Sequence, residues 1–508
     1  MKIQLPEWPW KVVRDLAQEL GVQIWIVGGA VRDLIVARSV HDWDFAIDRD
    51  AMVLARAVGS ALGGAFFPLD EERGTARVAL GTEHGSRVDL DFSLLRGDSL
   101  DADLAKRDFT INAMAVDESH ILIDPLGGRR DLRDERIRAT SERAFCDDPV
   151  RLLRAARLEA ELRFKIEPET EVWIRRDAPL LTSPAAERLR DEFVRGLVVS
   201  GASGFIERLD DLGLLMHVVP ELDSLKGVTQ SYPHRFDVWR HTLIVLKTLE
   251  AVVATVAGGP TQSSLHRWPD IPSAAWGDLI STGLERVIGQ FASDLRGHLA
   301  VVVSAGRDRG LLLKLAALLH DIGKPRTRSV DGDGRIHFYN HEPVGARMAT
   351  ARLRTLRFSR AAVQRVGTMI KGHLRPAHLA RGEEVTRRAI YRYFRDTGDA
   401  GVDIVLLSLA DHLATWGPNL RDERWMRRLE VAELLLHHYF ERRAETVAPE
   451  LPVDGHDLMG ELDIEPGPQI GLLLDSLREA MAAGEIETRE DALALARQVG
   501  KVDGAPAS

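Results

Sequence analysis

Two aspartates separated by one residue are the first side chains whose spacing indicates chemistry. Asp42 and Asp44 flank Trp43 in the segment WDFAID, which has the composition of a strand. Alternate residues of a strand face the same way, so both carboxylates lie on one face. Such a pair is suited to holding Mg²⁺ ions against a nucleoside triphosphate. Because this spacing is also common on protein surfaces, the residues around it decide the interpretation.

A glycine turn precedes the aspartates. The apolar run GVQIWIV predicts a buried strand that breaks at Gly28 and Gly29, and AVRDLIVAR then has helical spacing. Two glycines let the backbone approach a ligand closely, and the N-terminus of the next helix offers free N–H groups to a phosphate. The combination of this turn with Asp42 and Asp44 favours a nucleotide site over a surface pattern.

The composition excludes several classes of protein. Of 508 residues, 45% are hydrophobic and 28% are charged, which rules out disordered, collagenous and membrane-spanning chains. No stretch reaches the roughly 20 apolar residues of a membrane helix, so no membrane partner is expected. The start, MKIQLPEWPWKVVRDL, lacks a signal-peptide pattern. The single cysteine, Cys146, excludes an internal disulfide and fits the cytoplasm, which is the location we expect.

Three further blocks follow the glycine turn along the chain. They are KRDFTINAM at 106–114, DDPVRLLRAAR at 147–157 and ERLRDE at 187–192. Together with GGAVRD and DWDF, these blocks resemble the class II nucleotidyltransferases, which include the tRNA CCA-adding enzymes and the bacterial poly(A) polymerases. The resemblance implies a mixed α/β catalytic head followed by a helical neck and body.

The resemblance also implies a reaction and its residues. An RNA 3′-hydroxyl attacks the α-phosphate of a nucleotide, pyrophosphate leaves, and two Mg²⁺ ions held by Asp42 and Asp44 assist. The third catalytic carboxylate is predicted to be Asp89, with Asp91 on the same face as the alternative. The predicted nucleotide contacts are Gly28, Gly29, Arg32, Asp33, Arg107, Asp108 and Asn112; for Asn112 a purely structural side-chain-to-backbone bond is an equal alternative.

One predicted helix carries a possible base-reading pair. Asp148 and Pro149 have the pattern of a helix start, with Asp148 as N-cap. Arg151, Arg154 and Arg157 then follow at three-residue steps on one face, and no acid is interleaved. Cytosine and adenine both present an amine donor beside a ring-nitrogen acceptor, which a carboxylate and a guanidinium recognise. By resemblance, Asp148 and Arg151 select CTP and ATP, and Arg154 and Arg157 lie near the nucleotide.

A second group of potential ligands lies further along the chain. Its order H…HD…H…H…D resembles the HD phosphohydrolase superfamily. The resemblance implies that imidazoles and carboxylates ligate one or two divalent metals here, either Mg²⁺ or a transition metal. Such a site could hydrolyse a cyclic or 2′-phosphate. The alternative is a degenerate HD fold kept as an RNA-binding body, and Lys324 is either a phosphate contact or a solvated charge. The predicted ligands are His241, His320, Asp321, His341, His373 and Asp411.

Basic residues concentrate after the HD doublet. Between Arg352 and Arg395 there are twelve basic residues and only two acids, whereas the whole chain has a net charge of −10. The overall charge argues against a general coating of nucleic acid, but a local basic stripe suits phosphate contacts. We therefore predict that Arg387 and Arg388 contact the RNA.

These observations predict four domains. They are a nucleotidyltransferase head at 1–140, a helical neck at 141–228, an HD domain at 229–425 with an inserted loop near 257–277, and a helical tail at 426–508. The predicted function is addition of C, C and A to the 3′ end of tRNA from CTP and ATP.

Three alternatives differ in activity. A partial enzyme would add only CC or only A. A poly(A) polymerase is disfavoured because FFPLDEERGTARVAL stands where the poly(A) polymerases of this family carry a GRRFR-like segment. A metal-dependent phosphohydrolase with a nucleotide-binding head belongs to a different class, and the intact Asp42 and Asp44 argue against it.

Overall fold

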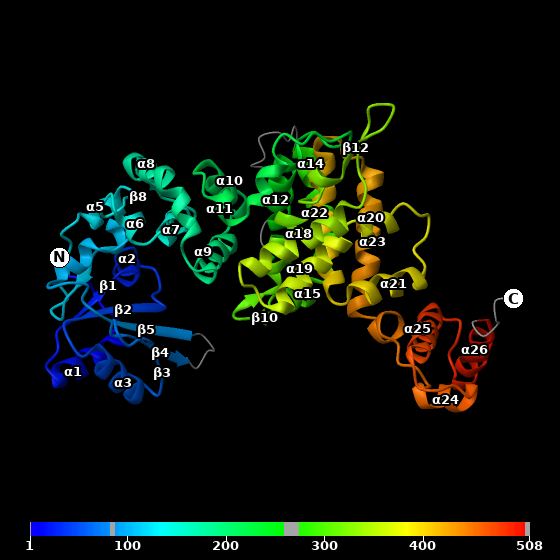
Figure 1. Cartoon of the computed structure of the whole chain (residues 1–508), viewed down its shortest axis with the longest axis horizontal. Coiled ribbons are helices and arrows are strands. Elements are labelled where there is room, and N and C mark those ends of the chain that lie inside the picture. The colour runs from blue at the N-terminus through cyan, green and yellow to red at the C-terminus, as the bar shows by residue number, and fades with distance from the viewer. Residues whose placement is uncertain (1, 82–86, 259–273, 503–508) are drawn as a thin grey trace. The chain divides into compact units, whose positions relative to one another are not determined.

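The computed structural model describes residues 2–81, 87–258 and 274–502, and its contacts divide the chain into two compact units (Figure 1). The first comprises residues 1–199 and 208–218, and the second comprises 200–207 and 219–508. The division runs through helix α10 (Ala202–Asp211). The predicted head and most of the neck thus fall in the first unit, and the predicted HD domain and tail fall in the second.

The first unit is built on a mixed seven-stranded sheet in the order β3-β4-β5-β2-β1-β6-β7. Only the β2–β5 pair is parallel, and its neighbours in the sheet are antiparallel. The strands are β1 (Ile24–Val27), β2 (Asp42–Ile47), β3 (Ala65–Asp70), β4 (Thr75–Gly81), β5 (Arg87–Leu94), β6 (Ala115–Val116) and β7 (Leu122–Ile123).

The two faces of this sheet have different roles. The rings of Trp10 and Phe45 stack with centroids 6.3 Å apart, and Phe45 stacks on Phe92 at 5.1 Å. These rings and Trp43 form a core on the side of α1 (Trp10–Leu20) and α3 (Ala51–Leu62). Because side chains alternate along β2, burial of its odd-numbered residues leaves the even-numbered ones for the opposite face.

Helices surround the sheet and form the neck. Helix α2 (Gly29–Ile35) follows the glycine turn, α4 (Leu100–Ala105) follows β5, and α5 (Gly128–Arg133) follows β7. The neck contains α6 (Ala144–Asp147), α7 (Val150–Leu162), α8 (Pro168–Asp177), α9 (Ala186–Val198) and α11 (Leu215–Val218), and the short strands β8 (Arg136–Ile137) and β9 (Lys165–Ile166) pair with each other. The predicted helix start is one residue off, because α7 begins at Val150 and Pro149 is its N-cap.

The second unit is a helical bundle with a tail. Helix α22 is buried along nearly its whole length and packs on α12 and α19. The bundle comprises α12 (Val238–Val256), α14 (Ala274–Gln290), α15 (Ala292–Leu299), α16 (Arg309–Leu319), α17 (Lys324–Thr327), α18 (His341–Thr355), α19 (Arg360–Gly372), α20 (Arg375–Leu379), α21 (Arg387–Thr397), α22 (Ala400–Trp416) and α23 (Asp422–Phe440). Two short hairpins join them, β10 (Val302–Ser304) with β11 (Arg307–Asp308) and β12 (Arg328–Val330) with β13 (Ile336–Phe338).

The tail has its own small core. Helices α24 (Gly455–Leu462), α25 (Pro468–Ala483) and α26 (Arg489–Val502) pack around Leu458 and Leu477. Most of the predicted loop at 257–277 lies outside the described residues. The prediction is wrong for the last four residues, because residues 274–277 already belong to α14, whose sequence AAWGDLISTGLERVIGQ has apolar residues at helical spacing.

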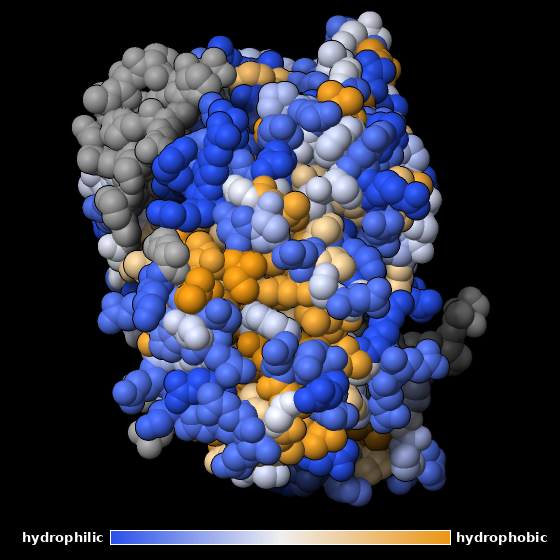
Figure 2. Space-filling view, turned by 90° about the vertical axis from the view of Figure 1, so that its left-hand side faces the viewer, coloured by the Kyte–Doolittle hydropathy of each residue, from blue (hydrophilic) through white to orange (hydrophobic). Residues whose placement is uncertain are grey.

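The surface is mixed in polarity. On the face drawn in Figure 2, hydrophobic residues gather in the middle and hydrophilic residues surround them. No helix among the described residues combines the length and apolarity needed to cross a bilayer.

Candidate active site

Four carboxylates share one face of the head sheet. In the parallel pairing of β2 with β5, Asp42 lies opposite Asp89 and Asp44 lies opposite Asp91. The structure therefore brings together the predicted pair and both candidates for the third catalytic carboxylate. Clustered carboxylate oxygens are the ligands that Mg²⁺ prefers.

Arg77 on β4 neutralises part of this cluster, and the sequence prediction missed it. Its Nε and Nη2 atoms donate to the two carboxylate oxygens of Asp91, each at 2.7 Å. Its Nη1 atom lies 3.3 Å from Asp89 Oδ2. The alternation in TARVAL put Arg77 on the same face as other odd-numbered residues of β4, but only the strand register identifies Asp91 as its partner. Of the two candidates, Asp91 is therefore the one held by a bidentate ion pair.

Asp44 is strained electrostatically. Burial, opposed by Arg107 and aided by the carboxylates of Asp91 and Asp42, raises the pKa of Asp44 to about 6. A bound divalent cation would relieve this repulsion, so these oxygen donors fit the predicted ions. Gly28 has φ 74°, and a Cβ at that position would lie 2.7 Å from Asp44 Oδ2. Glycine is thus required there for both its conformation and its size.

The predicted nucleotide contacts form a connected network beside the turn. Arg32 is buried and donates to Asp33 at 2.9 and 3.0 Å and to Asn112 Oδ1 at 2.9 Å. Asn112 in turn donates to Asp108 Oδ1 at 3.1 Å. The Nε atom of Arg107 donates to Asp103 at 3.0 Å. Asn112 therefore braces this network through its side chain.

No acid is interleaved among the three arginines of α7 in the sequence, but two of them have acidic partners on other elements. Arg154 donates to Glu192 Oε1 at 2.9 and 3.0 Å and to Asp108 Oδ2 at 3.0 Å, and Arg157 donates to Glu192 Oε2 at 2.7 Å. Glu192 belongs to α9, so the local sequence around α7 could not reveal it. Burial raises the pKa values of Asp108 and Glu192, but Arg154 has the opposite effect on both. It helps to hold the pKa of Asp108 at about 2 and the pKa of Glu192 below its usual range.

Replacing Arg154 with methionine is expected to lower the free energy of unfolding by about 3 kcal/mol at pH 7, because it leaves two buried carboxylates without their shared partner. The deficit should narrow as the pH falls towards 4. The variant's folded state then takes up protons, whereas Asp108 in the original chain resists protonation until about pH 2. Urea unfolding at several pH values measures this difference.

Arg130→Met is a suitable control for that experiment, because the Arg130 side chain is 77% exposed and its ion pair with Asp134 spans 3.7 Å. We expect this control to change stability by less than about 1 kcal/mol. A pH-independent deficit in Arg154→Met would contradict the electrostatic explanation.

The predicted base-reading pair is engaged with other groups. Asp148 Oδ2 accepts from Arg188 at 2.7 Å. Arg151 is buried and donates to the carbonyls of Lys106 at 2.8 Å, Ala144 at 3.2 Å and Arg107 at 3.3 Å. Burial lowers the pKa of Arg151, although Asp108 and Asp148 oppose this effect. Recognition of a base by either side chain would require exchange of these contacts.

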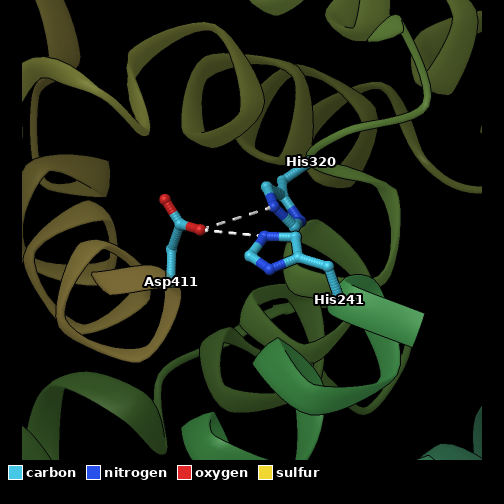
Figure 3. Close-up of side chains that lie close together, drawn as sticks. All are labelled: His241, His320 and Asp411. Atoms are coloured by element: carbon cyan, nitrogen blue, oxygen red, sulfur yellow. Dashed lines mark ion pairs between the residues drawn. The ribbon is translucent and has the colours of Figure 1, made fainter. Parts of the chain in front are cut away.

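The second unit gathers the predicted HD ligands around one point. His241 on α12 lies 3.1 Å from Asp411 on α22, and His320 Nε2 lies 4.0 Å from the same carboxylate oxygen (Figure 3). Asp321 lies 3.2 Å from His320 and 3.4 Å from His341. His320, Asp321 and His373 also have ligand atoms within 4.8 Å of one another. All six predicted ligands therefore meet, although five helices and turns supply them.

The histidine tautomers leave ligand atoms free to point inwards. The Nδ1 atoms of His320, His341 and His373 lie 2.7–2.8 Å from backbone carbonyls, which fixes Nε2 as the unprotonated nitrogen of a neutral ring. Among the described residues, the Nε2 atoms of His241, His320 and His341 and both oxygens of Asp321 are buried and have no hydrogen bond of regular geometry, although they lie within ion-pair range of one another and of Lys324. Burial lowers the pKa of His373 to about 3, so this ring is neutral at physiological pH. Buried imidazoles whose Nε2 atoms face inwards, together with carboxylates, fit a divalent metal.

A cavity of about 610 Å³ lies over these ligands. Lys324 contacts Asp321 at 2.6 Å and Gln230 at 2.7 Å and is buried, so it is not a solvated charge. His234 also lines the cavity, and its ring lies 5.0 Å from that of His241. The sequence prediction missed His234 because nothing in the spacing of SYPHRF marks it as a neighbour of the ligands.

Arg387 and Arg388, the predicted RNA contacts, face acids in the described structure. Arg387 lies 3.1 Å from Glu445, and Arg388 lies 2.7 Å from Glu485 and 3.2 Å from Glu479. RNA contacts by these two arginines would have to compete with the acids.

Models of four known protein domains match successive segments of this chain. Models described as a poly A polymerase head domain and as an RNA- and SrmB-binding site of polymerase A match residues 24–138 and 163–226. Models of the HD domain and of tRNA nucleotidyltransferase domain 2 match residues 286–416 and 426–496. Families with these domains use divalent metals.

Relatives match over nearly the whole chain. The A-adding tRNA nucleotidyltransferase of Deinococcus radiodurans is 35% identical, over 93% of this chain and 94% of the relative. The CC-adding enzyme of Thermus thermophilus is 32% identical, over 92% of each. A Thermotoga maritima CCA-adding enzyme complexed with tRNA shares the fold, with a TM-score of 0.54, 19% identity, and coverage of 97% of this chain and 96% of that one. The chain belongs to the tRNA nucleotidyltransferase family, whose members are enzymes.

Proposed function

We propose that this protein transfers nucleotides from CTP and ATP to the 3′ end of tRNA and releases pyrophosphate. The observation that carries the proposal is the side-by-side placement of Asp42 and Asp44 with Asp89 and Asp91 on one face of the sheet, beside a glycine turn that no larger residue would fit. The names of the relatives supply the RNA substrate and the two nucleotides.

The chain's own groups divide the work in this proposal. Asp42 and Asp44 would hold Mg²⁺, and Asp89 would be the third carboxylate, with Asp91, which Arg77 holds in a bidentate ion pair, as the alternative. Bound Mg²⁺ would act as a Lewis acid on the attacking hydroxyl and the leaving pyrophosphate. Arg32 and Arg107 are fixed donors for the triphosphate.

Base selection falls to Asp148 and Arg151. A carboxylate accepts from the exocyclic amine shared by cytosine and adenine, and a guanidinium donates to the adjacent ring nitrogen. In this proposal the nucleotide displaces Arg188 from Asp148 and carbonyl oxygens from Arg151.

A second candidate is addition of only part of the CCA end. The observation that favours it is that relatives matching more than nine tenths of the chain are named A-adding and CC-adding tRNA nucleotidyltransferases. Three tRNA substrates distinguish the candidates: one that lacks CCA, one that ends in C and one that ends in CC. Each is incubated with CTP, ATP or both, and the product length is measured.

The outcomes of this experiment are distinct. Full CCA addition extends all three substrates to the same end. A CC-adding enzyme stops after the second C, and an A-adding enzyme extends only the substrate that ends in CC. Long A tracts would identify a poly(A) polymerase, and no extension of any substrate would contradict the proposed function.

We also propose that the HD ligands bind a divalent metal and hydrolyse a cyclic or 2′-phosphate. Support comes from the inward-facing imidazoles and the buried carboxylate of Asp321 beneath the cavity. Lys324 is positioned to balance the charge of a phosphate.

Asp321→Asn is expected to weaken metal binding at this site by about 100-fold or more, since even groups that merely orient metal ligands contribute 10- to 100-fold. Titration calorimetry with Mn²⁺ measures this loss, and hydrolysis of 2′,3′-cyclic AMP should fall with it. His437→Asn, at a half-buried histidine outside the cavity, serves as control. Unchanged Mn²⁺ affinity in Asp321→Asn would contradict the metal site.

A further inference from the structure

The basic residues between Arg352 and Arg395 divide into paired and unpaired groups. The paired arginines include Arg352, Arg365, Arg375, Arg387, Arg388, Arg392 and Arg395, which contact acids elsewhere in the second unit. By contrast, Arg354, Arg360 and Lys371 are exposed and form no ion pair with any residue in the described part of the chain. Arg347, just before this stretch, shares both properties. Within the described part of the chain, Arg381 between α20 and α21 is likewise exposed and without an ion pair, but most of the available positive charge lies on α18 and α19 and not on α21.

These four cations line a single groove. Helices α18 and α19 lie side by side in Figure 1, and the groove of about 1120 Å³ is lined by residues of these helices and of the turn between them. Arg347 and Arg354 come from α18, and Arg360 and Lys371 come from α19. No aspartate or glutamate is among the lining residues. Two rows of like charge thus face each other across a groove.

The lining between the cations is small and partly polar. A Cβ on Gly367 would lie 3.1 Å from the hydroxyl of Thr350, so the two helices approach closely at this point. Small side chains such as Ala346 and Ala351 leave room above that contact, and Thr368 adds a hydroxyl. A phosphate-bearing strand could therefore enter the groove and meet guanidinium groups on both sides.

Charge complementarity selects the occupant. The chain as a whole has a net charge of −10, so a groove with four cations and no lining acid differs sharply from the average surface. Like charges held close together repel, and a polyanion of regular phosphate spacing removes that repulsion while it releases counterions. The family's RNA substrate is such a polyanion.

We propose that the groove between α18 and α19 binds the sugar-phosphate backbone of the tRNA substrate. This inference rests on the proposed function for the identity of the RNA. It moves the RNA contact from Arg387 and Arg388 to a surface whose cations are free. The contacts are to phosphates, so the groove contributes affinity and not sequence recognition.

The double variant Arg347→Gln/Arg354→Gln tests the groove. The Kd of the full chain for tRNA is measured by filter binding between 50 and 300 mM salt. We expect the Kd to rise by roughly 10- to 50-fold at 0.1 M salt, and the slope of log K against log salt to become shallower by about 1.5–2. In steady-state addition assays, the change should fall on KM for tRNA.

Two matched double variants complete the experiment. Arg129→Gln/Arg421→Gln removes the same charge at exposed positions outside the groove and should leave the slope unchanged. Arg387→Gln/Arg388→Gln tests the competing location, and a smaller effect than in the groove variant supports the inference. An unchanged slope of log K for tRNA against log salt in the groove variant overturns the inference. The inference is also overturned if the groove variant loses binding to phosphatidylglycerol vesicles while its affinity for tRNA stays unchanged. If the unaltered chain extends tRNA, failure of the groove variant to weaken binding refutes only this inference. If it extends no tRNA, the proposed function itself has failed.

Discussion

Replacing Asp42 or Asp44 with asparagine is expected to lower the rate of nucleotide addition by about 10³-fold or more. In the proposed mechanism, each substitution removes a negatively charged oxygen ligand of Mg²⁺. A bound metal ion contributes several kcal/mol to stabilisation of the transition state, and each 1.36 kcal/mol corresponds to about a tenfold change in rate. The two side chains are not part of the ring core on the other face of β2, so the fold should persist. Single-turnover addition to tRNA measures the effect.

Asp98→Asn provides the matched control, since this carboxylate is exposed and lies outside the cluster. It should retain the full rate, and all three variants should have similar melting temperatures. Near-normal addition by either Asp42→Asn or Asp44→Asn would show that the chemistry takes place elsewhere.

Arg151→Ala is expected to lower kcat/KM for CTP or ATP by about 10- to 150-fold, because it removes one charged hydrogen bond worth about 1.5–3 kcal/mol. Exclusion of UTP and GTP should relax at the same time. The loss of selectivity is the informative part, because Arg151 also holds three backbone carbonyls and its removal could lower activity through structure alone.

Two further variants separate base reading from structural support. Asp148→Asn should also relax nucleotide selection, since an amide can present a donor to the base amine. Arg188→Gln removes the partner of Asp148 without altering its carboxylate. If Asp148 serves only to bind Arg188, the two variants will behave alike. Unchanged preference among the four nucleotides in both Asp148→Asn and Arg151→Ala would contradict the base-reading assignment.

The parts of the fold and site that were predictable depend on local pattern or on family blocks. The alternation in WDFAID placed Asp42 and Asp44 on one face, and Gly28 was recognisable as a turn before any contact was known. The predicted HD ligands His320 and Asp321 were recognisable as residue types in a known order. Their position next to the other predicted ligands depends on how the helices of the bundle pack.

The parts that were missed depend on partners distant in sequence. Glu192, which neutralises Arg154 and Arg157, lies on another helix, and its pairing depends on the packing of α7 against α9. Arg77 acquires its role only from the register of β4 with β5. Charge counting selected Arg388, but Glu485 lies 97 residues further along the chain. Composition shows where charge is abundant, and only tertiary contacts show where it is unneutralised.

The most direct test of the central claim is the stoichiometry of the reaction. Purified protein is incubated with tRNA that lacks its CCA end, Mg²⁺, and α-labelled CTP and ATP, and both pyrophosphate and incorporated nucleotide are measured. The account predicts one pyrophosphate for each nucleotide joined to the tRNA 3′ end, and no incorporation in Asp44→Asn. Release of nucleoside monophosphate without any extension of the tRNA would contradict it.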